Sequence, residues 1–304
     1  NIRWNRLLEA PIRPNACAQK GNCLMTGMIG PPGFAGEWFG GAITTHATCV
    51  LAPNAGPQTL DGTNTWLIGA PGSASFTVID PGPDDVAHWQ VVAAEVESRG
   101  ARIERILLTH GHLDHSAGAR MFAEAAGCAV QALDPTHQYG SEGVVGGDVL
   151  ELSGVEIRVV ATPGHSSDSL SFYLPQDDSL LTGDTVLGRG TTVVAYPDGT
   201  LVEYLDSLHR LRELIAESDL TMILPGHGPT LDQPAGVIDY YLAHRHERLE
   251  QVRVAINELG GHGLPIQDLA QRVVEAVYAD VPKSVWPLAL LSVRAQLEYL
   301  ATHG

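Results

Sequence analysis

As far as about residue 225, the chain alternates between short apolar runs and turns rich in glycine, proline and aspartate. Apolar and β-branched runs of this length, bounded by such turns, are typical of buried strands. Segments 84–98 and 202–217 instead place apolar residues three or four positions apart, which predicts amphipathic helices. A further helix is expected at 116–126, and strands are expected at 47–51, 59–68 (a turn leading into a strand), 76–80, 103–108, 129–133, 149–152, 156–161, 169–174, 179–182 and 221–224.

The pattern changes after residue 235, where three helices are expected at about 236–259, 266–278 and 285–302. Gly260-Gly261 ends the first of these helices, and Pro265 opens the second. Strands punctuated by helices predict an α/β fold of layered sheets covered by helices. We therefore expect three parts, which are an irregular N-terminal arm at 1–45, a main domain at 46–235 and a small helical domain at 236–304.

Composition and charge narrow the class of protein. The chain is 44% hydrophobic with no apolar run of the roughly 20 residues that a membrane span needs, so we expect a soluble cytoplasmic protein without a membrane partner. Four cysteines without Cys-x-x-Cys spacing predict free thiols, with Cys49 and Cys128 in the core. Residues 1–242 hold 12 Lys and Arg against 28 Asp and Glu, whereas residues 243–304 hold 6 against 7. The acidic part argues against duplex DNA as a partner.

Candidate chemistry is concentrated in one loop, Thr109-His110-Gly111-His112-Leu113-Asp114-His115. In an extended loop the alternating residues His110 and His112 project to the same side. Asp114 and His115 follow where the chain turns toward a helix, and they could face a second ion beside the first. Four imidazole and carboxylate groups within six residues are typical of a metal site rather than of an ordinary polar loop.

Three further candidate ligands also follow predicted strands. His165 comes after strand 156–161, Asp184 after strand 179–182 and His227 after strand 221–224. Strand ends with neighbouring glycines let the backbone come close, so we expect these side chains to converge on one edge of the fold. Each has an ordinary alternative as a turn or capping residue. Together with the loop they make seven ligands, enough for two ions of four protein ligands each if Asp184 bridges them.

The order of these residues, His110-x-His112-x-Asp114-His115 and then His165, Asp184 and His227, resembles the metallo-β-lactamase superfamily. It is most similar to the hydrolases of that family with a bridging aspartate, such as glyoxalase II and the RNase Z group. The resemblance implies a four-layer αββα sandwich and two divalent ions, most often Zn²⁺ and sometimes Mn²⁺ or Fe²⁺. It also implies that one ion is held by His110, His112 and His165, the other by Asp114, His115 and His227, and that Asp184 lies between them.

A closer likeness lies outside the ligands. The segments 59–65, 183–192 and Tyr241-x-x-His244-Arg245 resemble the lactamase-β-like subgroup, whose animal members are endoribonucleases of single-stranded RNA. The helices expected at 266–278 and 285–302 resemble the winged-helix-like domain of that subgroup. The resemblance therefore covers about residues 47–304 and implies single-stranded RNA as a substrate.

The chemistry follows from the ligands. Two close divalent ions lower the pKa of a bridging water toward neutrality and polarise the oxygen of the bond under attack. Asp114 would be the catalytic residue that orients the resulting hydroxide and accepts or passes on its proton.

Several residues are expected to contact the substrate. Asn64 would offer an amide, with a simple turn position as its alternative. His244, Arg245 and Arg248 could bind a phosphate, but a solvated helix face paired with Glu247 and Glu250 is the alternative that we favour. The residues expected to shape the pocket beside the metals are Gly188, Gly190, Thr191 and Thr192.

Three functions are compatible with these features. The first is a binuclear metal-dependent hydrolase that uses a metal-bridging hydroxide to cleave single-stranded RNA. The second is a thioesterase of glyoxalase II type, or another acyl or lactam hydrolase, although no cluster of basic residues follows residue 253. The third is a non-catalytic nucleic-acid-binding protein, against which the complete ligand set argues. The expected partner is RNA or a small acyl or thioester substrate, and a homodimer is left open.

Overall fold

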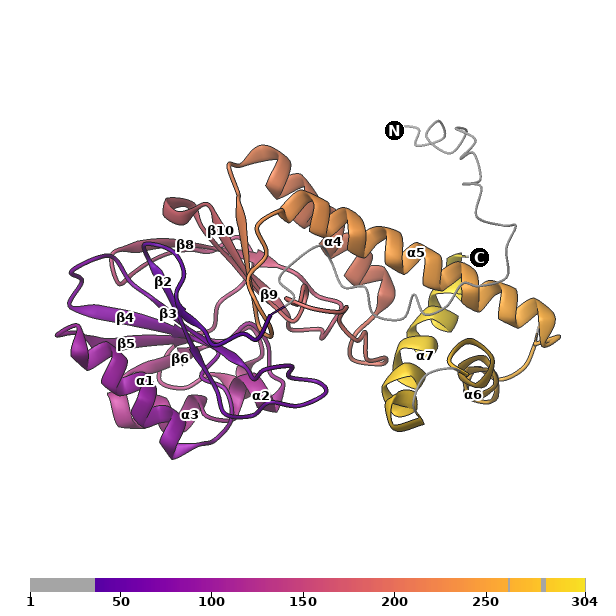
Figure 1. Ribbon diagram of the computed structural model, residues 1–304, viewed down its shortest axis with the longest axis horizontal. Coiled ribbons are helices and arrows are strands. Elements are labelled where there is room, and N and C mark those ends of the chain that lie inside the picture. Colours follow the sequence, from indigo (N-terminus) through magenta and orange to yellow (C-terminus); the bar gives the residue numbers. More distant parts are fainter. Residues whose placement is uncertain (1–35, 262, 280–282, 304) are drawn as a thin grey trace.

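The computed structural model describes residues 36–261, 263–279 and 283–303 (Figure 1). Most of the arm expected at 1–45 lies outside these residues. Within its last ten residues, Gly41–Ala42 forms a short strand, β1, that was not predicted and pairs with the next strand. None of the helices in the described part is long and apolar enough to cross a membrane.

The first sheet has six strands, which follow one another in chain order. Strands β1 to β4 run antiparallel to their neighbours, whereas β4, β5 and β6 run parallel. Parallel neighbours need a crossover, which helices α1 and α3 provide. The elements are β1 (Gly41–Ala42), β2 (Ala47–Leu51), β3 (Asn64–Ile68), β4 (Ser75–Ile79), α1 (Val86–Ser98), β5 (Arg102–Leu107), α2 (Leu113–Ser116), α3 (Ala119–Ala126) and β6 (Ala129–Gln131).

The second sheet has five strands in the order β11-β10-β9-β8-β7. Its hairpins are antiparallel, and the single parallel pair, β10 with β11, is bridged by helix α4. The elements are β7 (Val149–Leu152), β8 (Val155–Ala161), β9 (Leu170–Leu174), β10 (Ser179–Gly183), α4 (Leu201–Glu217), β11 (Met222–Pro225) and α5 (Pro234–Glu258), with single 3-10 turns at Pro135–His137, Pro175–Asp177 and Lys283–Val285.

Three layers of apolar side chains hold these elements together. One lies between the first sheet and helices α1 and α3, one between the two sheets, and one between the second sheet and helices α4 and α5. In Figure 1, α1 and α3 lie on one outer side of the sheets, and α4 and α5 lie on the other. The expected αββα sandwich is therefore confirmed.

The start predicted for the helix at 116–126 is wrong. The structure has two helices there, α2 (Leu113–Ser116) and α3 (Ala119–Ala126), with Gly118 between them. The turn at Gly82 and Pro83 packs against this point: Gly118 donates its N–H to the Gly82 carbonyl (2.9 Å), and a Cβ at Gly118 would lie only 2.6 Å from the Pro83 oxygen. Because α2 begins three residues earlier than expected, it carries Asp114 and His115 on a helical turn.

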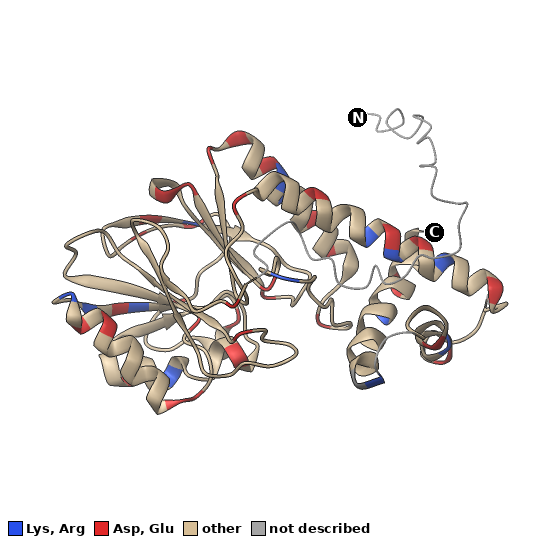
Figure 2. Cartoon of the chain, viewed as in Figure 1, with Lys and Arg blue, Asp and Glu red and all other residues tan. Residues whose placement is uncertain are grey.

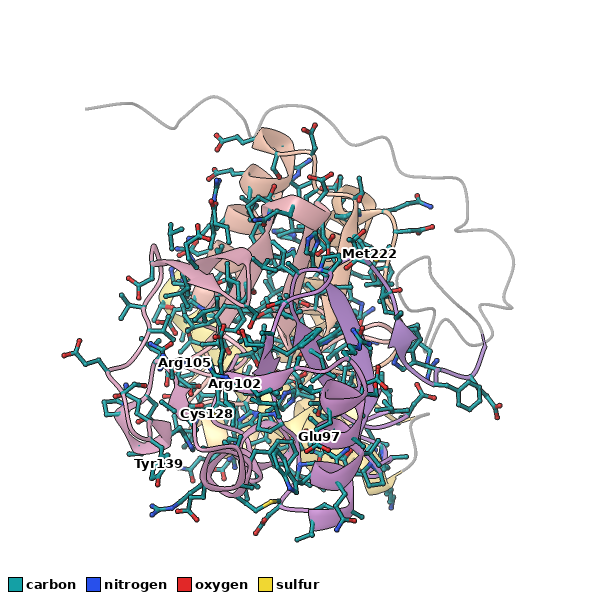
Figure 3. The ribbon with its side chains drawn as sticks, turned by 90° about the vertical axis from the view of Figure 1, so that its left-hand side faces the viewer. Glu97, Arg102, Arg105, Cys128, Tyr139 and Met222 are labelled. Carbon is teal, nitrogen blue, oxygen red and sulfur yellow. The ribbon has the colours of Figure 1, made fainter. Side chains whose placement is uncertain are left out.

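The two cysteines expected in the core differ in their surroundings. Cys49 is buried between the two sheets, and burial raises the pKa of its thiol. Cys128 is half-buried near Arg105, at the end of the molecule away from the C-terminal helices (Figure 3). Burial raises the pKa of Cys128 as well, so both thiols remain protonated at neutral pH. The cysteines Cys17 and Cys23 lie outside the described residues.

The C-terminal helices α6 (Ile266–Val277) and α7 (Trp286–His303) form a fourth apolar cluster with the last turns of α5. The first half of the same helix packs on α4, where Tyr241 and Leu242 are buried. The boundary expected between 235 and 236 thus falls in the first turn of α5, and one continuous helix belongs to both apolar cores.

Leu208 provides a test of the outermost layer of the sandwich. It is fully buried between α4 and the second sheet, so Leu208→Ala should lower the free energy of unfolding by about 2–5 kcal/mol through lost burial and the cavity left behind. Leu113, 74% exposed, is the matched control, and its change to alanine should shift stability by less than about 0.5 kcal/mol. Urea unfolding followed by circular dichroism measures both, and equal losses would contradict the assigned layer.

Candidate metal centre

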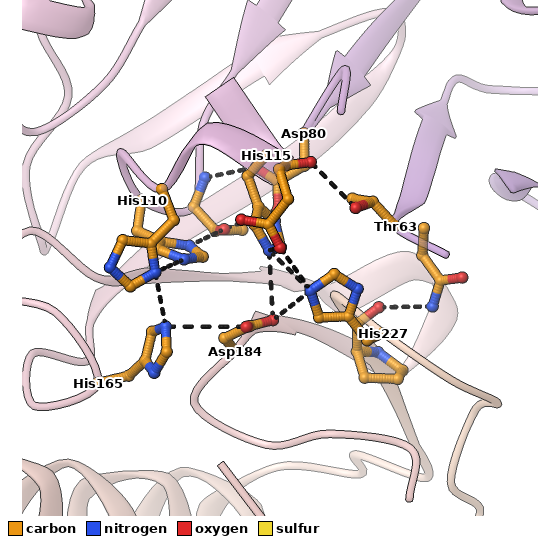
Figure 4. Close-up of polar contacts among 12 residues, drawn as sticks. Thr63, Asp80, His110, His115, His165, Asp184 and His227 are labelled. Atoms are coloured by element: carbon orange, nitrogen blue, oxygen red, sulfur yellow. Dashed lines mark hydrogen bonds and ion pairs between the residues drawn. The ribbon is translucent and has the colours of Figure 1, made fainter. Parts of the chain in front are cut away.

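The seven expected ligands come together at one edge of the sandwich, where strands of both sheets end (Figure 4). Backbone hydrogen bonds join the sheets at this edge: Leu170 N–H donates to the Thr109 carbonyl (2.7 Å), and Asn64 N–H donates to the Gly226 carbonyl (2.8 Å). The ligands follow β5 (His110, His112), lie in α2 (Asp114, His115), or follow β8 (His165), β10 (Asp184) and β11 (His227).

Three imidazoles form the first group. His112 Nδ1 lies 3.0 Å from His110 Nε2 and 3.0 Å from His165 Nε2. Nitrogens around a tetrahedral zinc ion with Zn–N bonds of about 2.0–2.1 Å would be separated by about 3.3 Å. The three nitrogens are therefore spaced as ligands of one ion.

The second group consists of Asp114, His115 and His227. His227 Nε2 lies 3.2 Å from His115 Nε2 and 3.1 Å from Asp114 Oδ2. Asp184 lies between the two groups: its Oδ1 is 3.4 Å from His115 Nε2 and 3.5 Å from His227 Nε2, and its Oδ2 is 3.7 Å from His165 Nε2. One carboxylate thus faces both groups at once.

The residues present fit divalent cations. Oδ1 of Asp184 is buried and has no hydrogen-bond partner among the described residues. A buried carboxylate oxygen without a donor is costly, and a cation at this point would compensate it. Imidazole nitrogens and carboxylate oxygens together are the donors that zinc, iron and manganese accept. The two groups around Asp184 could therefore hold one ion each.

Hydrogen bonds at the outer ring nitrogens orient three of the histidines. His165 Nδ1 donates to the Val193 carbonyl (2.7 Å), His227 Nδ1 to the Gly62 carbonyl (3.2 Å) and His115 Nδ1 to Asp80 Oδ2 (2.9 Å). Carbonyl and carboxylate oxygens can only accept, so each Nδ1 carries its proton. In each ring it is then Nε2 that is aimed at the centre and available to bind a cation.

The charges within the site are strongly coupled. Burial favours the neutral acid of Asp184, but the imidazoles of His227, His115 and His165 outweigh it and hold the pKa of Asp184 well below its usual range. Burial also opposes a charge on His115, yet the carboxylates of Asp184 and Asp80 raise its pKa well above the usual value. Burial and the neighbouring imidazoles of His115 and His165 keep the pKa of His110 well below its usual value. The ionised carboxylate of Asp184 thus favours positive charge on the groups around it, which a bound divalent cation would supply.

Asp80 is a residue of the site that the sequence analysis missed. Its Oδ1 accepts from Thr109 N–H (2.8 Å), and its Oδ2 accepts from the Thr109 hydroxyl (2.7 Å) as well as from His115. It fixes both the loop that carries His110 and the ring of His115. Asp80 directly follows β4 and precedes Pro81-Gly82-Pro83, so it has the strand-end position that identified the other carboxylates and could have been found in the same way.

The loop after β10 contacts two of the candidate ligands, His165 and His227. The Thr192 hydroxyl lies 3.1 Å from His165 Nδ1. Gly188 donates its N–H to the His227 carbonyl (2.9 Å), and a Cβ at Gly188 would lie 2.1 Å from the Pro229 oxygen, which only glycine avoids. Gly190 accepts a hydrogen bond from the Tyr241 hydroxyl (3.3 Å). The residues expected to shape the pocket therefore hold the ligands and the loop in place.

Asn64 requires a correction. It was expected to offer an amide to the substrate, but its side chain is completely buried. Its Nδ2 donates to the Pro225 carbonyl (2.9 Å) and the Gly228 carbonyl (2.8 Å), and its Oδ1 accepts from Trp38 Nε1 (2.7 Å). Asn64 therefore positions the loop that carries His227.

Arg245 also differs from expectation, because its side chain is turned into the protein and does not lie on a solvated helix face. It is buried, its Nη2 donates to the Thr192 carbonyl (2.6 Å), and its guanidinium lies 4.8 Å from the ring centre of Tyr204. Burial, with Arg245 and Arg248 nearby, lowers the pKa of its neighbour His244 to about 4, so His244 is neutral at pH 7 and its Nε2 lies 3.3 Å from the Thr191 hydroxyl.

The remaining arginine of that group, Arg248, also has partners within the protein. It donates to Gln251 Oε1 (2.8 Å) and lies over the ring of Tyr278. Glu250, its expected partner, instead pairs with Arg253. The arginines on this face of α5 are therefore engaged with the protein itself and are not free to meet a phosphate.

Asp80→Asn tests the orientation of His115. An asparagine keeps one acceptor oxygen and places an amide NH2 where the other was, against either the Thr109 N–H or the His115 Nδ1–H, so zinc affinity should fall about 10–100-fold, the usual effect of losing such a partner. The matched control is Asp177→Asn, since Asp177 is likewise buried and pairs with His46, outside the centre. Competition with a chromogenic chelator measures the affinity. Unchanged affinity in the first variant, or an equal loss in the control, would contradict the assignment.

Comparison with known proteins agrees with this architecture. The profile of the metallo-beta-lactamase superfamily matches residues 59–227, and that of the beta-lactamase associated winged helix domain matches residues 270–304. A beta-lactamase domain protein from Burkholderia ambifaria of known structure has the same fold, with a TM-score of 0.69 at 22% identity over 86% of this chain and 88% of that one. The second profile identifies α6 and α7 as part of a winged-helix domain.

Two relatives are similar over most of their length. The beta-lactamase-like protein 2 homolog of Drosophila melanogaster is 31% identical over 86% of this chain and 90% of its own. The atrochrysone carboxyl ACP thioesterase of Aspergillus fumigatus is 31% identical over 78% of this chain and 74% of its own. With its sandwich, its cluster of seven candidate ligands and these matches, the chain belongs to the metallo-β-lactamase superfamily.

Proposed function

We propose that the protein is a hydrolase with two zinc ions that cleaves thioesters or closely related acyl bonds. In this reaction the oxygen of water attacks the acyl carbon, the carbon–sulfur bond breaks, and a carboxylic acid and a thiol are released. Divalent ions at the centre would polarise the acyl carbonyl and bring the pKa of water toward neutrality. The two ligand groups around Asp184 support two ions rather than one.

Asp114 is the group placed to handle the proton of the attacking water. Its side chain is 31% exposed, against 11% for Asp184 and none for His115 and His227. Burial tends to raise the pKa of Asp114, but its contacts with His227 and His115 outweigh burial, and the pKa is lowered. Asp114 is therefore ionised at neutral pH, with Oδ2 turned to His227 and Oδ1 left to accept a proton and pass it to solvent.

The charges around the centre are the observation that favours an acyl substrate over RNA. A polyanion binds through lysines and arginines that are free to meet its phosphates. Here Arg245 is buried and donates to the Thr192 carbonyl, and Arg189 pairs with Asp61. Carboxylates lie beside the ligand loop instead: a Cβ at Gly111 would be 3.1 Å from Asp168 Oδ2. Figure 2 shows acidic residues on the helices and in several loops of the chain. A neutral thioester suits these surroundings better, and the thioesterase among the relatives supports the proposal.

Cleavage of single-stranded RNA is the second candidate. It is favoured by the match of residues 270–304 to a winged-helix domain and by the nearly balanced charge of residues 243–304. In that case the same centre would act on a phosphodiester, with the C-terminal helices in contact with the nucleic acid.

Zinc-loaded protein should hydrolyse acyl thioesters, detected by release of the free thiol, and leave an end-labelled single-stranded RNA intact. His112→Ala should lower the thioesterase rate about 100-fold or more, because it removes the nitrogen shared by the first group. His46→Ala, a histidine paired with Asp177 away from the centre, should keep the rate.

Two results would contradict the proposal. RNA cleavage that His112→Ala abolishes, without thioester hydrolysis, would favour the second candidate. Failure on both substrates, with two ions per chain confirmed by elemental analysis, would exclude both.

A further inference from the structure

Thr63, the residue before β3, lies beside the second ligand group and is completely buried (Figure 4). Its hydroxyl oxygen lies 3.0 Å from the backbone carbonyl oxygen of Asp114. Its backbone forms an isolated antiparallel bridge with His227, and the carbonyl of the preceding residue, Gly62, accepts from His227 Nδ1 (3.2 Å). One residue thus contacts the segments that carry two of the three candidate ligands of this group.

The carbonyl of Asp114 needs this partner because of the way in which α2 ends. In a longer helix it would accept from the N–H of Gly118, four residues further along the chain. That N–H donates instead to the Gly82 carbonyl (2.9 Å), and the N–H of Gly82 donates to the His115 carbonyl (3.0 Å). Because the last carbonyls of a helix must find donors outside it, the Thr63 hydroxyl completes the end of the helix that carries Asp114.

Asn54 fixes the direction in which the Thr63 hydroxyl donates. Its Oδ1 accepts from the Thr63 N–H (2.9 Å), which identifies the other amide atom as the nitrogen Nδ2. Nδ2 can only donate, and it lies 2.9 Å from the Thr63 hydroxyl oxygen. The hydroxyl therefore accepts from Asn54, and its own proton is left for the Asp114 carbonyl, which can only accept.

This chain of hydrogen bonds ends on a residue whose carboxylate belongs to the second group. Oδ2 of Asp114 lies 3.1 Å from Nε2 of His227, and that spacing depends on where α2 is held relative to the segment of His227. Thr63 contacts both segments, so it fixes one relative to the other. Losing a contact that orients a ligand from outside typically lowers metal affinity about 10–100-fold.

The first group has supports of its own. The Val193 carbonyl accepts from His165 Nδ1, and the Thr192 hydroxyl lies 3.1 Å from the same nitrogen. Both residues belong to the loop after β10, whereas Asn54 and Thr63 belong to the connection between β2 and β3. Different parts of the chain therefore hold the two ligand groups.

We propose that Thr63, oriented by Asn54, is a positioning residue that sets the affinity of the second ligand group for its cation and leaves that of the first group unchanged. The inference rests on the two ions of the proposed function and not on its substrate. Through the same contact, Thr63 holds in place the residue that handles the proton of the attacking water, Asp114.

Two backgrounds of the full chain separate the groups. In His112→Ala only the second group keeps its ligands, and in His227→Ala only the first does. Thr63→Val keeps the shape of the side chain and removes the hydroxyl. It should lower zinc affinity about 10–100-fold in the His112→Ala protein and leave zinc affinity unchanged in the His227→Ala protein. Competition with a chromogenic chelator measures both affinities.

Three further variants exclude a general loss of structure. Thr63→Ser keeps the hydroxyl and should retain the zinc affinity of the His112→Ala protein. Asn54→Ala, which changes a half-buried residue and removes the bonds that orient Thr63, should lower that affinity as Thr63→Val does. Thr77→Val is the matched control, because Thr77 is equally buried and its hydroxyl lies 3.1 Å from the Ser153 hydroxyl, outside the centre. It should leave both affinities unchanged.

The outcomes separate this inference from the proposed function. Equal losses of affinity in the two backgrounds, no loss in the His112→Ala protein, or no recovery with serine would overturn the role of Thr63. Wild-type protein that binds two zinc ions but hydrolyses no thioester would overturn the proposed substrate, and the affinities in the two backgrounds would still decide the role of Thr63. A single zinc ion per wild-type chain would overturn both.

Discussion

The buried carboxylate of Asp184 is the constraint on which the arrangement of this molecule depends. An anion at the junction of two sheets is tolerated only where positive charge surrounds it. Imidazoles from the ends of β5, β8 and β11 and from α2 meet that requirement, and their rings are in turn held by Asp80 and by backbone carbonyls. The strand order, the short helix α2 and the glycines near the ligands all serve to bring these groups to one point.

The sequence predicts most of the fold and the location of the centre. Short apolar runs ending in His, Asp and Gly locate strands and ligands together, because a strand end fixes where its next residue lies. The contacts that support the centre are harder to predict. Asn64 bonds carbonyls 161 and 164 residues away, and Arg245 bonds Thr192, so nothing local shows their roles. A family likeness identifies such positions without distinguishing support from substrate contact. The start of α2 was missed because it depends on the distant turn at Gly82 and Pro83.

The loop after β10 connects the centre with the rest of the chain. On one side Thr192 and Val193 meet His165, and on the other Tyr241 and Arg245 of α5 hold the same loop. Further along, Tyr196 faces the C-terminal helices. The geometry of the first candidate ligand group is therefore set partly by a helix outside the sheets.

The continuity of α5 has a consequence for recombination between relatives. A chimaera joined at the visible change of composition, near residue 235, would replace the turns of α5 that carry Tyr241 and Arg245 and so exchange part of the support of the metal site along with the C-terminal helices. A crossover after Leu249, where the helix passes from one apolar core to the other, would keep that support intact. The C-terminal part that could be exchanged as a unit thus begins in the middle of α5. The change of composition near residue 235 does not reveal this boundary, because the first half of the helix packs on the main domain.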